Sequence, residues 1–383
     1  NQLTELLIMS KAWAEKNKSV EPKDAKTKDE NFAHRNAMGS GAYMVKEWQP
    51  DQKLVLVKNP NWWGWSEVPT NVTEIIYTPI KNEATRAAAL LSGEIDFVLD
   101  PSPQDLGRMR SNANLKVMDG IENRTIFLGL DQHRDELPGS NVKGKNPLKD
   151  VKVRKALYQA IDIDTIHRVT MRGLSQNTGA LVAPQVNGWT KEVDTRFPYS
   201  QDASKKLLAE AGYPNGFETT IWSAYNHTTA QKVIQFLQQQ LAQVGIKAQV
   251  QALEAGQRVE KVESAQDPAT APVRMYYVGW SSSTGEADWA MRPLLASESF
   301  PPKMFNTAYY KNDAVDKDIA KALITTDAKQ KTALYTDAQQ RIWKDAPWAF
   351  LATEQLLSAH SSNLSGFHVM PDASFNFDDV DLK

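Results

Sequence analysis

The sequence predicts an α/β protein built from two lobes joined by a hinge. Strand-like and helix-like patterns alternate along most of the chain, which favours sheets covered by helices. At 383 residues the chain exceeds the usual size of a single compact core. The pattern also turns from β-rich to helix-rich after Asp131 and returns to an extended apolar run at Ala349. We therefore expect the chain to cross between the lobes twice.

The first third of the chain predicts mainly strands, with turn signals at Pro50 and Pro60. A short helix in this part ends at Gly93, and a helical pattern also opens the chain. Helices are expected at 1–17, 83–92 and 103–111, and strands at 42–45, 54–57, 75–77, 95–99 and 125–130.

The remainder predicts mainly helices. The clearest has apolar residues on one stripe, a capping-box spacing between Thr228 and Gln231, and a stop at Gly245. Helices are expected at 153–161, 164–172, 200–211, 228–244, 313–325 and 328–344, and strands at 246–252, 275–278 and 349–357.

Composition excludes several classes of function. The formal net charge of −2 gives no electrostatic basis for binding nucleic acid or an anionic membrane. No apolar run approaches the roughly 20 residues needed to span a bilayer. The chain has no cysteine, which excludes disulfides and thiol chemistry. The six histidines are scattered without metal-ligand spacing, so neither a metal nor another cofactor is expected.

The most informative segment is 275–295, where an apolar strand runs into a polar loop and then a helix. The loop begins at Gly279-Trp280, continues with hydroxyl residues to Thr284, and carries Glu286 and Asp288 into the helix. A strand that delivers a ring, hydroxyls and carboxylates to one loop is a common way to present a polar ligand site. The alternative is an ordinary turn in which Ser and Asp cap the helix.

Two further features of the sequence suggest other functions, a nucleotide site and a hydrolase. Residues 139–146 nearly match the phosphate-binding G-x-x-x-x-G-K-[ST] loop. However, no apolar strand precedes them, Asn146 replaces the hydroxyl residue and Pro147 interrupts a helix, so no nucleotide site is expected. A hydrolase that uses Glu286 and Asp288 as acid and base is the rival hypothesis from another functional class. Carboxylates two residues apart at a helix start are more often caps or ligand contacts.

Several segments, taken in order, resemble the family 5 extracytoplasmic solute-binding proteins of bacterial ABC importers. These segments are 39–43 (GSGAY), 59–63 (NPNWW), 151–157 (VKVRKAL), 160–162 (AID), 238–246 (QQQLAQVGI) and the Gly279-Trp280 loop. Residues 283–290 (STGEADWA), residues 306–309 (NTAY) and the tail from Ser358 to Leu382 resemble the glutathione-binding members of the family. The resemblance covers nearly the whole chain.

The resemblance implies the type II periplasmic-binding-protein fold, in which two α/β lobes close on a solute. It implies an exported, periplasmic monomer without enzymatic activity, whose partner is an ABC permease. Lobe one is expected at 34–133 plus 350–383, lobe two at 134–349, and 1–33 as the remnant of an extra N-terminal domain. Family members carry a further N-terminal segment, so we expect residues upstream of Asn1.

One departure from the family pattern bears on the solute. Peptide-binding relatives place an Asp, which meets the ligand amine, about five residues into the Gly-Trp loop, where this chain has Ser283. The amine then needs another acid, for which Asp288 and Glu286 are the candidates. A γ-glutamyl ligand such as glutathione fits this loop better than a standard peptide. A di- or oligopeptide ligand is the alternative.

The predicted ligand contacts follow from the charges of glutathione, which carries two carboxylates and one ammonium at neutral pH. Each charge needs a partner in a closed cleft, and arginine forks suit carboxylates. Asp288 is chosen for the ammonium, and Arg292 is a weaker third choice among the arginines. The predicted contacts are Tyr43, Arg124, Arg172, Tyr225, Asn226, Trp280, Ser282, Ser283, Thr284 and Asp288. Tyr43 and Trp280 are expected to contact the solute from different lobes.

Overall fold

The computed structural model describes residues 8–23, 29–264, 267–268, 271–272, 274–374 and 376–383. The chain forms two compact units. Unit 1 comprises 1–120, 357–370 and 374–383, and unit 2 comprises 121–356 and 371–373. The strand β5 (Leu115–Leu130) begins in unit 1 and ends in unit 2, and β10 (Trp348–Ser361) returns. The chain thus crosses inside two long strands, whereas the sequence analysis placed the limits at 133/134 and 349/350. The assignment of 1–33 to a separate remnant stays a prediction.

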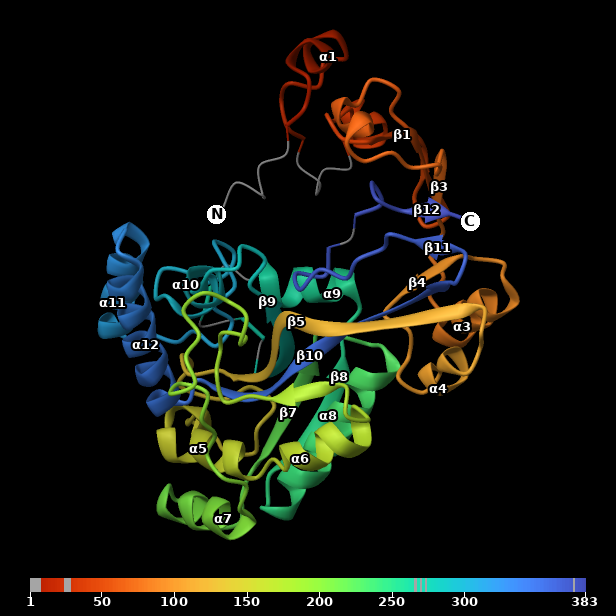
Figure 1. Cartoon of the computed structure of the whole chain (residues 1–383). Helices are drawn as coiled ribbons and strands as arrows, with labels where there is room; N and C mark the ends of the chain where they lie inside the picture. The colour runs from red at the N-terminus through yellow and green to blue at the C-terminus, as the bar shows by residue number, and fades with distance from the viewer. Residues whose placement is uncertain (1–7, 24–28, 265–266, 269–270, 273, 375) are drawn as a thin grey trace. The chain divides into compact units, whose positions relative to one another are not determined.

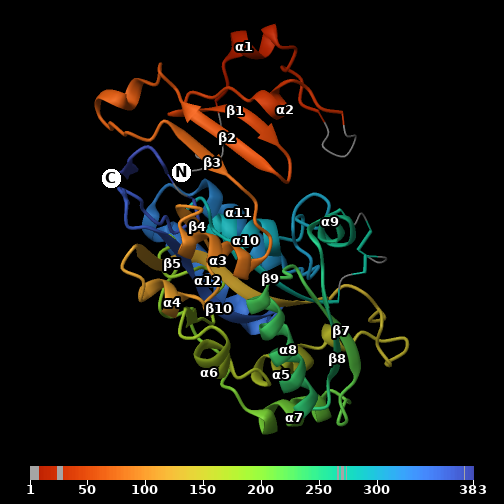
Figure 2. The ribbon, with the colours of Figure 1, turned by 90° about the vertical axis from the view of Figure 1, so that its right-hand side faces the viewer.

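Unit 1 contains a three-stranded antiparallel sheet in the order β1-β2-β3 (Figure 2). Its strands are β1 (Tyr43–Gln49), β2 (Lys53–Lys58) and β3 (Glu74–Tyr77), in the part of the chain where apolar runs and turn signals predicted strands. The helix α3 (Glu83–Ser92) also matches its prediction. Asn82 caps its first turn, and Gly93 ends it in the left-handed conformation with φ 78°.

The rest of unit 1 consists of short elements. In the strand β4 (Phe97–Leu99), residues pair antiparallel with the last part of β10, and β11 (Leu364–Ser365) pairs with β12 (Asp381–Leu382). The short helices are α1 (Lys11–Lys16), α2 (Ala33–Asn36), η3 (Trp63–Ser66) and α4 (Leu106–Arg110). Of the helix predicted at 1–17, residues 1–7 lie outside the described part of the chain. Two small apolar clusters, around Leu90 and Phe367, form the core.

Unit 2 is built on a mixed sheet in which the strand order is β10-β5-β9-β7-β8, with β6 (Ser175–Asn177) added on β10. The strand β9 (Met275–Ser281) runs antiparallel to β5 and parallel to β7 (Glu218–Ser223). β7 in turn runs parallel to β8 (Lys247–Ala252). The strand β7, which lies between β9 and β8, was not predicted from the sequence.

Helices cover the unit 2 sheet (Figure 1). Here α5 packs against α7, α8 against β7 and β8, and α11 against α12, around one large apolar core. The helices are η4 (Pro147–Lys149), α5 (Val151–Gln159), α6 (Ile163–Thr165), η5 (Ile166–Thr170), α7 (Gln201–Glu210), α8 (Thr228–Gln243), α9 (Ala255–Arg258), η6 (Val259–Glu263), α10 (Ala287–Leu295), α11 (Asp313–Ile324) and α12 (Ala328–Asp345).

The start of α8 differs from its prediction. The capping box expected at Thr228 and Gln231 is wrong, because the N-cap is His227, whose Nδ1 accepts from the backbone N–H of Ala230 at 3.3 Å. A ring nitrogen therefore satisfies a helix-end donor that a Ser or Thr hydroxyl usually satisfies. The apolar stripe is confirmed, since its Val and Leu residues are buried. Gly245 follows the helix with φ 91°.

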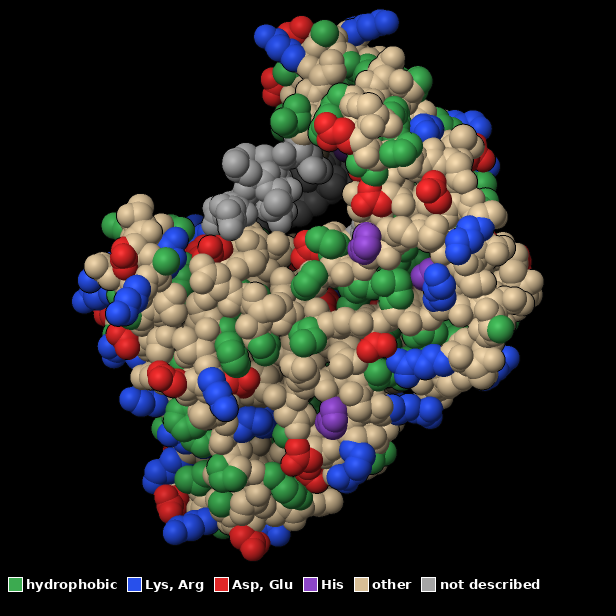
Figure 3. Space-filling view, in the orientation of Figure 1, with side chains coloured by type: hydrophobic (Ala, Val, Ile, Leu, Met, Phe, Trp, Pro, Cys, Tyr) green, Lys and Arg blue, Asp and Glu red, His purple; other side chains and the backbone are tan. Residues whose placement is uncertain are grey.

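The body of unit 2 carries surface charges of both signs. On the face that Figure 3 shows, Lys and Arg side chains are interspersed there with Asp and Glu. Among the residues that the structure describes, no helix combines the length and the apolar character needed to cross a membrane.

Candidate functional site

The candidate site lies at one edge of the unit 2 sheet, where the neighbouring parallel strands β7 and β9 end (Figure 1). After β7 a short loop with Tyr225 leads into α8, and after β9 the hydroxyl loop leads into α10. The antiparallel neighbour β5 brings Arg124 to the same edge, because Arg124 pairs with Ser281. Ligands of α/β sheets commonly bind beyond the carboxyl ends of parallel strands, next to the helices that follow.

Gly279 allows three side chains to meet at this edge. A Cβ at position 279 would clash with the side chain of Ile126 and would lie 3.0 Å from both Arg124 Cδ and the Tyr225 hydroxyl. The Tyr225 hydroxyl instead accepts a hydrogen bond from the Gly279 N–H at 3.0 Å. The missing side chain therefore gives room for Arg124 and Tyr225, which explains why glycine precedes Trp280.

Arg124 is held by acidic neighbours. Its Nε donates to Oε1 of Glu122 at 2.7 Å, and the Glu122 side chain is buried. Burial lowers the pKa of Arg124, but Tyr225, Glu122 and Glu354 together raise it, so the guanidinium is charged. Burial raises the pKa of Tyr225, which Arg124 lowers and Glu354 raises.

The hydroxyl loop shapes its own turn. The Ser282 hydroxyl donates to the Glu286 carbonyl at 3.2 Å, and the Thr284 hydroxyl accepts from the Glu286 N–H at 3.4 Å. Ser282 and Thr284 are buried, whereas Ser283 is partly exposed. Gly285 adopts φ 69°, which suits glycine, at the point where the chain turns toward α10. Of these three hydroxyl residues, Ser283 is the most accessible to a solute.

The two carboxylates at the start of α10 have protein partners. Arg292 binds both oxygens of Asp288, with N–O distances of 2.8–3.0 Å, and Asp288 is buried. The amide of Asn187 donates to both oxygens of Glu286, at 3.2 and 3.1 Å. Asp288 was expected to bind the ammonium of the ligand. In the structure its charge is balanced by Arg292 of the same helix, which was the third choice among the predicted arginines.

Comparison with known proteins decides the family. The model of bacterial extracellular solute-binding proteins, family 5, matches residues 2–302. The chain belongs to this family. It is also similar to the glutathione-binding protein GsiB of Salmonella choleraesuis and of Escherichia coli O1:K1, each 41% identical over 348 residues, or 90% of this chain. The chain covers 64% of the length of these curated relatives.

Solved structures give the same family fold. The ABC transporter-associated periplasmic binding protein DppA of Helicobacter pylori, in complex with the peptide STSA, has a TM-score of 0.79 and 26% identity, over 98% of this chain and 68% of that one. The oligopeptide-binding protein AppA of Bacillus subtilis, with a nonapeptide, has a TM-score of 0.79 over 98% and 72% of the two chains. Its 23% identity supports the fold alone.

Family 5 is a family of solute-binding proteins and not of enzymes. The hydrolase hypothesis, which used Glu286 and Asp288, is therefore set aside. The partners of both carboxylates agree with this, because each is held by a hydrogen-bonding side chain.

Trp280 has structural contacts at the same edge. Its indole N–H donates to the Trp289 carbonyl at 2.7 Å, and its ring packs against the rings of Trp289 and Phe305. The side chain is partly buried against the large core. The indole N–H of Trp280 therefore already has a hydrogen-bond partner. The solute contact predicted for Trp280 can involve only the exposed part of its ring.

Three further residues, Arg172, Asn226 and Tyr43, were predicted from the sequence as ligand contacts. Arg172 is exposed after η5, with φ 53°, and Asn226 is exposed and donates to Glu254 at 2.9 Å. Tyr43 lies in unit 1, where its hydroxyl donates to the Val72 carbonyl at 3.1 Å and burial raises its pKa. Their roles as ligand contacts stay predictions.

Sequence reasoning missed Glu122 and Glu354. Glu122 lies two residues before Arg124, and side chains two apart on a strand share one face, so this neighbour was open to prediction. Glu354 follows Arg124 by 230 positions, the difference between the two residue numbers, and lies on β10, which neighbours β5. No local pattern signals that relation.

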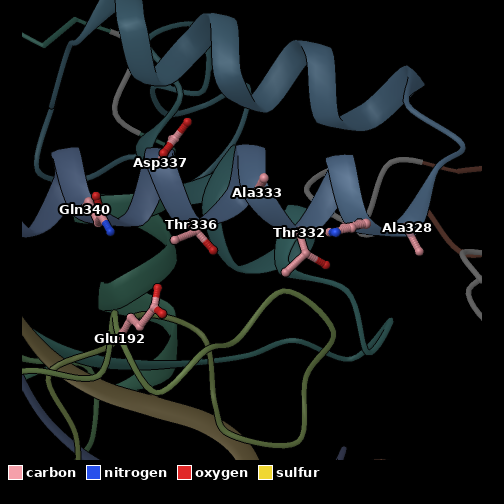
Figure 4. A pocket seen from close by; sticks show the side chains of 8 residues that line it. Glu192, Ala328, Thr332, Ala333, Thr336, Asp337 and Gln340 are labelled. Atoms are coloured by element: carbon pink, nitrogen blue, oxygen red, sulfur yellow. The ribbon is translucent and has the colours of Figure 1, made fainter.

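Other hollows are separate from this edge. One of about 660 Å³ lies beside α12, where Glu192 faces the helix across from Thr336 and Gln340 (Figure 4). Another, of about 420 Å³, lies in unit 1 beside His360 and Phe367. None of the ligand contacts predicted from the sequence lines either hollow. Within the described ranges, no three His, Asp or Glu side chains are arranged to hold a metal ion.

Proposed function

We propose that this chain is the solute-capturing part of an ABC importer, and that it binds glutathione or a closely similar small peptide. The main support for this proposal is that the chain is 41% identical, over 90% of its length, to proteins named for glutathione binding. On this proposal the protein acts outside the cytoplasm as a monomer and delivers its solute, chemically unchanged, to a membrane permease. The association of the similar Helicobacter pylori protein with an ABC transporter supports that partner.

The sheet edge of unit 2 supplies the chemistry that this solute needs. Arg124 provides a charged fork for a carboxylate, and Glu122 and Glu354 provide negative charge for an ammonium. Ser283 offers a hydroxyl and Trp280 part of an apolar ring for the uncharged portion. The resemblance to the family implies that Ser283 stands where peptide-binding members have an amine-binding Asp, which supports a solute other than a standard peptide.

The proposal is tested on the solute itself. Mass spectrometry of material released by denaturing freshly purified protein should identify glutathione. Calorimetry with glutathione should give saturable binding, and the glutathione should be recovered intact after long incubation.

A di- or oligopeptide ligand is the second candidate, because the similar Helicobacter pylori protein DppA holds the peptide STSA. The same calorimeter can compare glutathione with Met-Leu, Ala-Ala and a tetrapeptide. Preference for glutathione supports the proposal. Tighter binding of an ordinary peptide replaces it with the second candidate.

A further inference from the structure

The group around Arg124 combines both signs of charge. Arg124 is bonded to the buried Glu122 at 2.7 Å, and the guanidinium has four further N–H donors beyond Nε. Glu354 lies on β10, the neighbour of β5 in the sheet, and its negative charge raises the pKa of Arg124, of Tyr225 and of Tyr277. One guanidinium and two carboxylates leave the group with a net negative charge.

A solute can use a polar atom beside this group. Ser281 pairs with Arg124 in the ladder of β9 and β5, so both side chains lie on one face of the sheet. The Ser281 hydroxyl oxygen is buried and has no hydrogen-bond partner among the described residues. A buried hydroxyl without a partner costs free energy that a bound polar group can recover.

Charge balance decides which solute group suits this group of residues. A lone carboxylate would bind Arg124 but meet two negative side chains, and a lone ammonium would meet the guanidinium. A carboxylate and an ammonium attached to one carbon satisfy both signs within the span of a single α-amino acid. Asp288 does not provide a second site of this kind for an ammonium. Arg292 already balances its charge and donates hydrogen bonds to both of its carboxylate oxygens.

We infer that Glu122, Arg124, Ser281 and Glu354 form a subsite for an α-amino acid zwitterion, and hence for the γ-glutamyl end of a peptide. This inference rests on the proposed function and specifies its chemistry. Arg124 takes the α-carboxylate, Glu354 takes the α-ammonium, and Ser281 binds the remaining oxygen. Glu122 is a positioning residue, because it orients Arg124 from the buried side.

The inference separates two peptides of the same composition and charge. In γ-Glu-Cys-Gly the free ammonium and carboxylate of glutamate share one carbon. In α-Glu-Cys-Gly the ammonium neighbours an amide, and the free carboxylate is at the end of the side chain. A subsite for the zwitterion should prefer the γ isomer by about ten-fold or more, because the α isomer leaves a buried polar group without its partner.

The experiment is calorimetry with both isomers on the full chain and five variants. Arg124→Gln and Glu354→Gln should reduce the γ-to-α affinity ratio to below about three-fold. Arg341→Gln and Glu298→Gln are the matched controls, because they neutralise the same residue types in surface ion pairs with Asp318 and Lys303 of unit 2. The controls should keep the parent ratio. Thermal unfolding of every variant establishes that it is folded, and Glu354→Asp should restore part of the preference.

Each outcome decides one claim. Equal affinity of the parent for the two isomers overturns the inference and leaves the proposed function standing. A parent preference that both Arg124→Gln and Glu354→Gln retain also overturns it, since the zwitterion then binds elsewhere. If the parent binds neither isomer, the proposed function fails, and the inference fails with it.

Discussion

The backbone N–H of Gly279 donates to the hydroxyl of Tyr225 at 3.0 Å, and this bond joins the ends of two parallel strands. The bond exists because residue 279 has no side chain. It sets the position of the Tyr225 ring beside Arg124, and therefore the spacing of the polar groups at this edge of the sheet.

Gly279→Ala should weaken glutathione binding at least ten-fold, because the added methyl group displaces Arg124 or Tyr225. The free energy of unfolding should fall by about 1–3 kcal/mol, as is usual for overpacking. Calorimetry and urea unfolding measure the two effects. Gly256→Ala is the control, because nothing lies within 4 Å of a Cβ at that position. Unchanged affinity in Gly279→Ala would remove this role of the glycine.

Asp288→Asn distinguishes the two assignments of the ligand ammonium. Loss of the charge leaves Arg292 with a weaker partner, so the free energy of unfolding should fall by about 1–3 kcal/mol. If Glu354 rather than Asp288 holds the ammonium, the glutathione affinity should stay within about three-fold of the parent value. A loss of roughly 2–5 kcal/mol in binding would instead return the ammonium to Asp288.

Arg154→Met should destabilise unit 2 by about 3 kcal/mol or more. The buried guanidinium of Arg154 donates to the carbonyls of Asp345 and Ala346 at the C-terminal end of α12, and to those of Leu148 and Lys149 before α5. Burial lowers the pKa of Arg154 to about 10, which still leaves it charged at neutral pH. Urea unfolding checks the loss.

The control for Arg154→Met is Lys152→Ala, which removes an exposed ion pair with Glu210 on neighbouring helices. Its effect should be within about 1 kcal/mol, as for most surface pairs. Equal effects of the two substitutions would show that the carbonyl contacts of Arg154 contribute little.

Asp131 should give the stability of unit 2 a distinct pH dependence. Burial raises the pKa of Asp131 above its ordinary value of 3.8, although Arg134 lowers it. The folded state therefore holds this proton more tightly than the unfolded state. The stabilising contribution is fully present below pH 3.8 and is lost as the pH rises through the folded-state pKa.

Asp131→Asn has no such titration, so the unfolding free energy of the parent minus that of the variant should be greater at pH 4 than at pH 7. Urea unfolding at the two pH values provides the comparison. A difference that grows toward pH 7 would mean that the ion pair with Arg134, at 2.6 Å, lowers the pKa after all.

Much of the fold was predictable because local sequence patterns determine many of its helices and strands. The apolar stripe of α8 and the stop at Gly93 follow from spacing and backbone geometry that each segment holds by itself. The strand β7 was missed because its residues alternate weakly, and its assignment depends on pairing with β8 and β9. The limits of the two compact units fall inside β5 and β10, because both strands continue beyond the apolar runs that first indicated them.

The sequence by itself determined the family, the α/β class and the loop that begins at Gly279-Trp280, because each of these depends on patterns within contiguous residues. Only the tertiary structure decided how charges are paired. It joined Asp288 to Arg292 and Arg124 to Glu122, and it placed Glu354 on β10, the neighbour of β5, where its charge raises the pKa of Arg124. Electrostatic energy depends on distance in space, and residues on neighbouring strands can be far apart in the chain. The partner of each charge therefore becomes known only when the sheet is assembled.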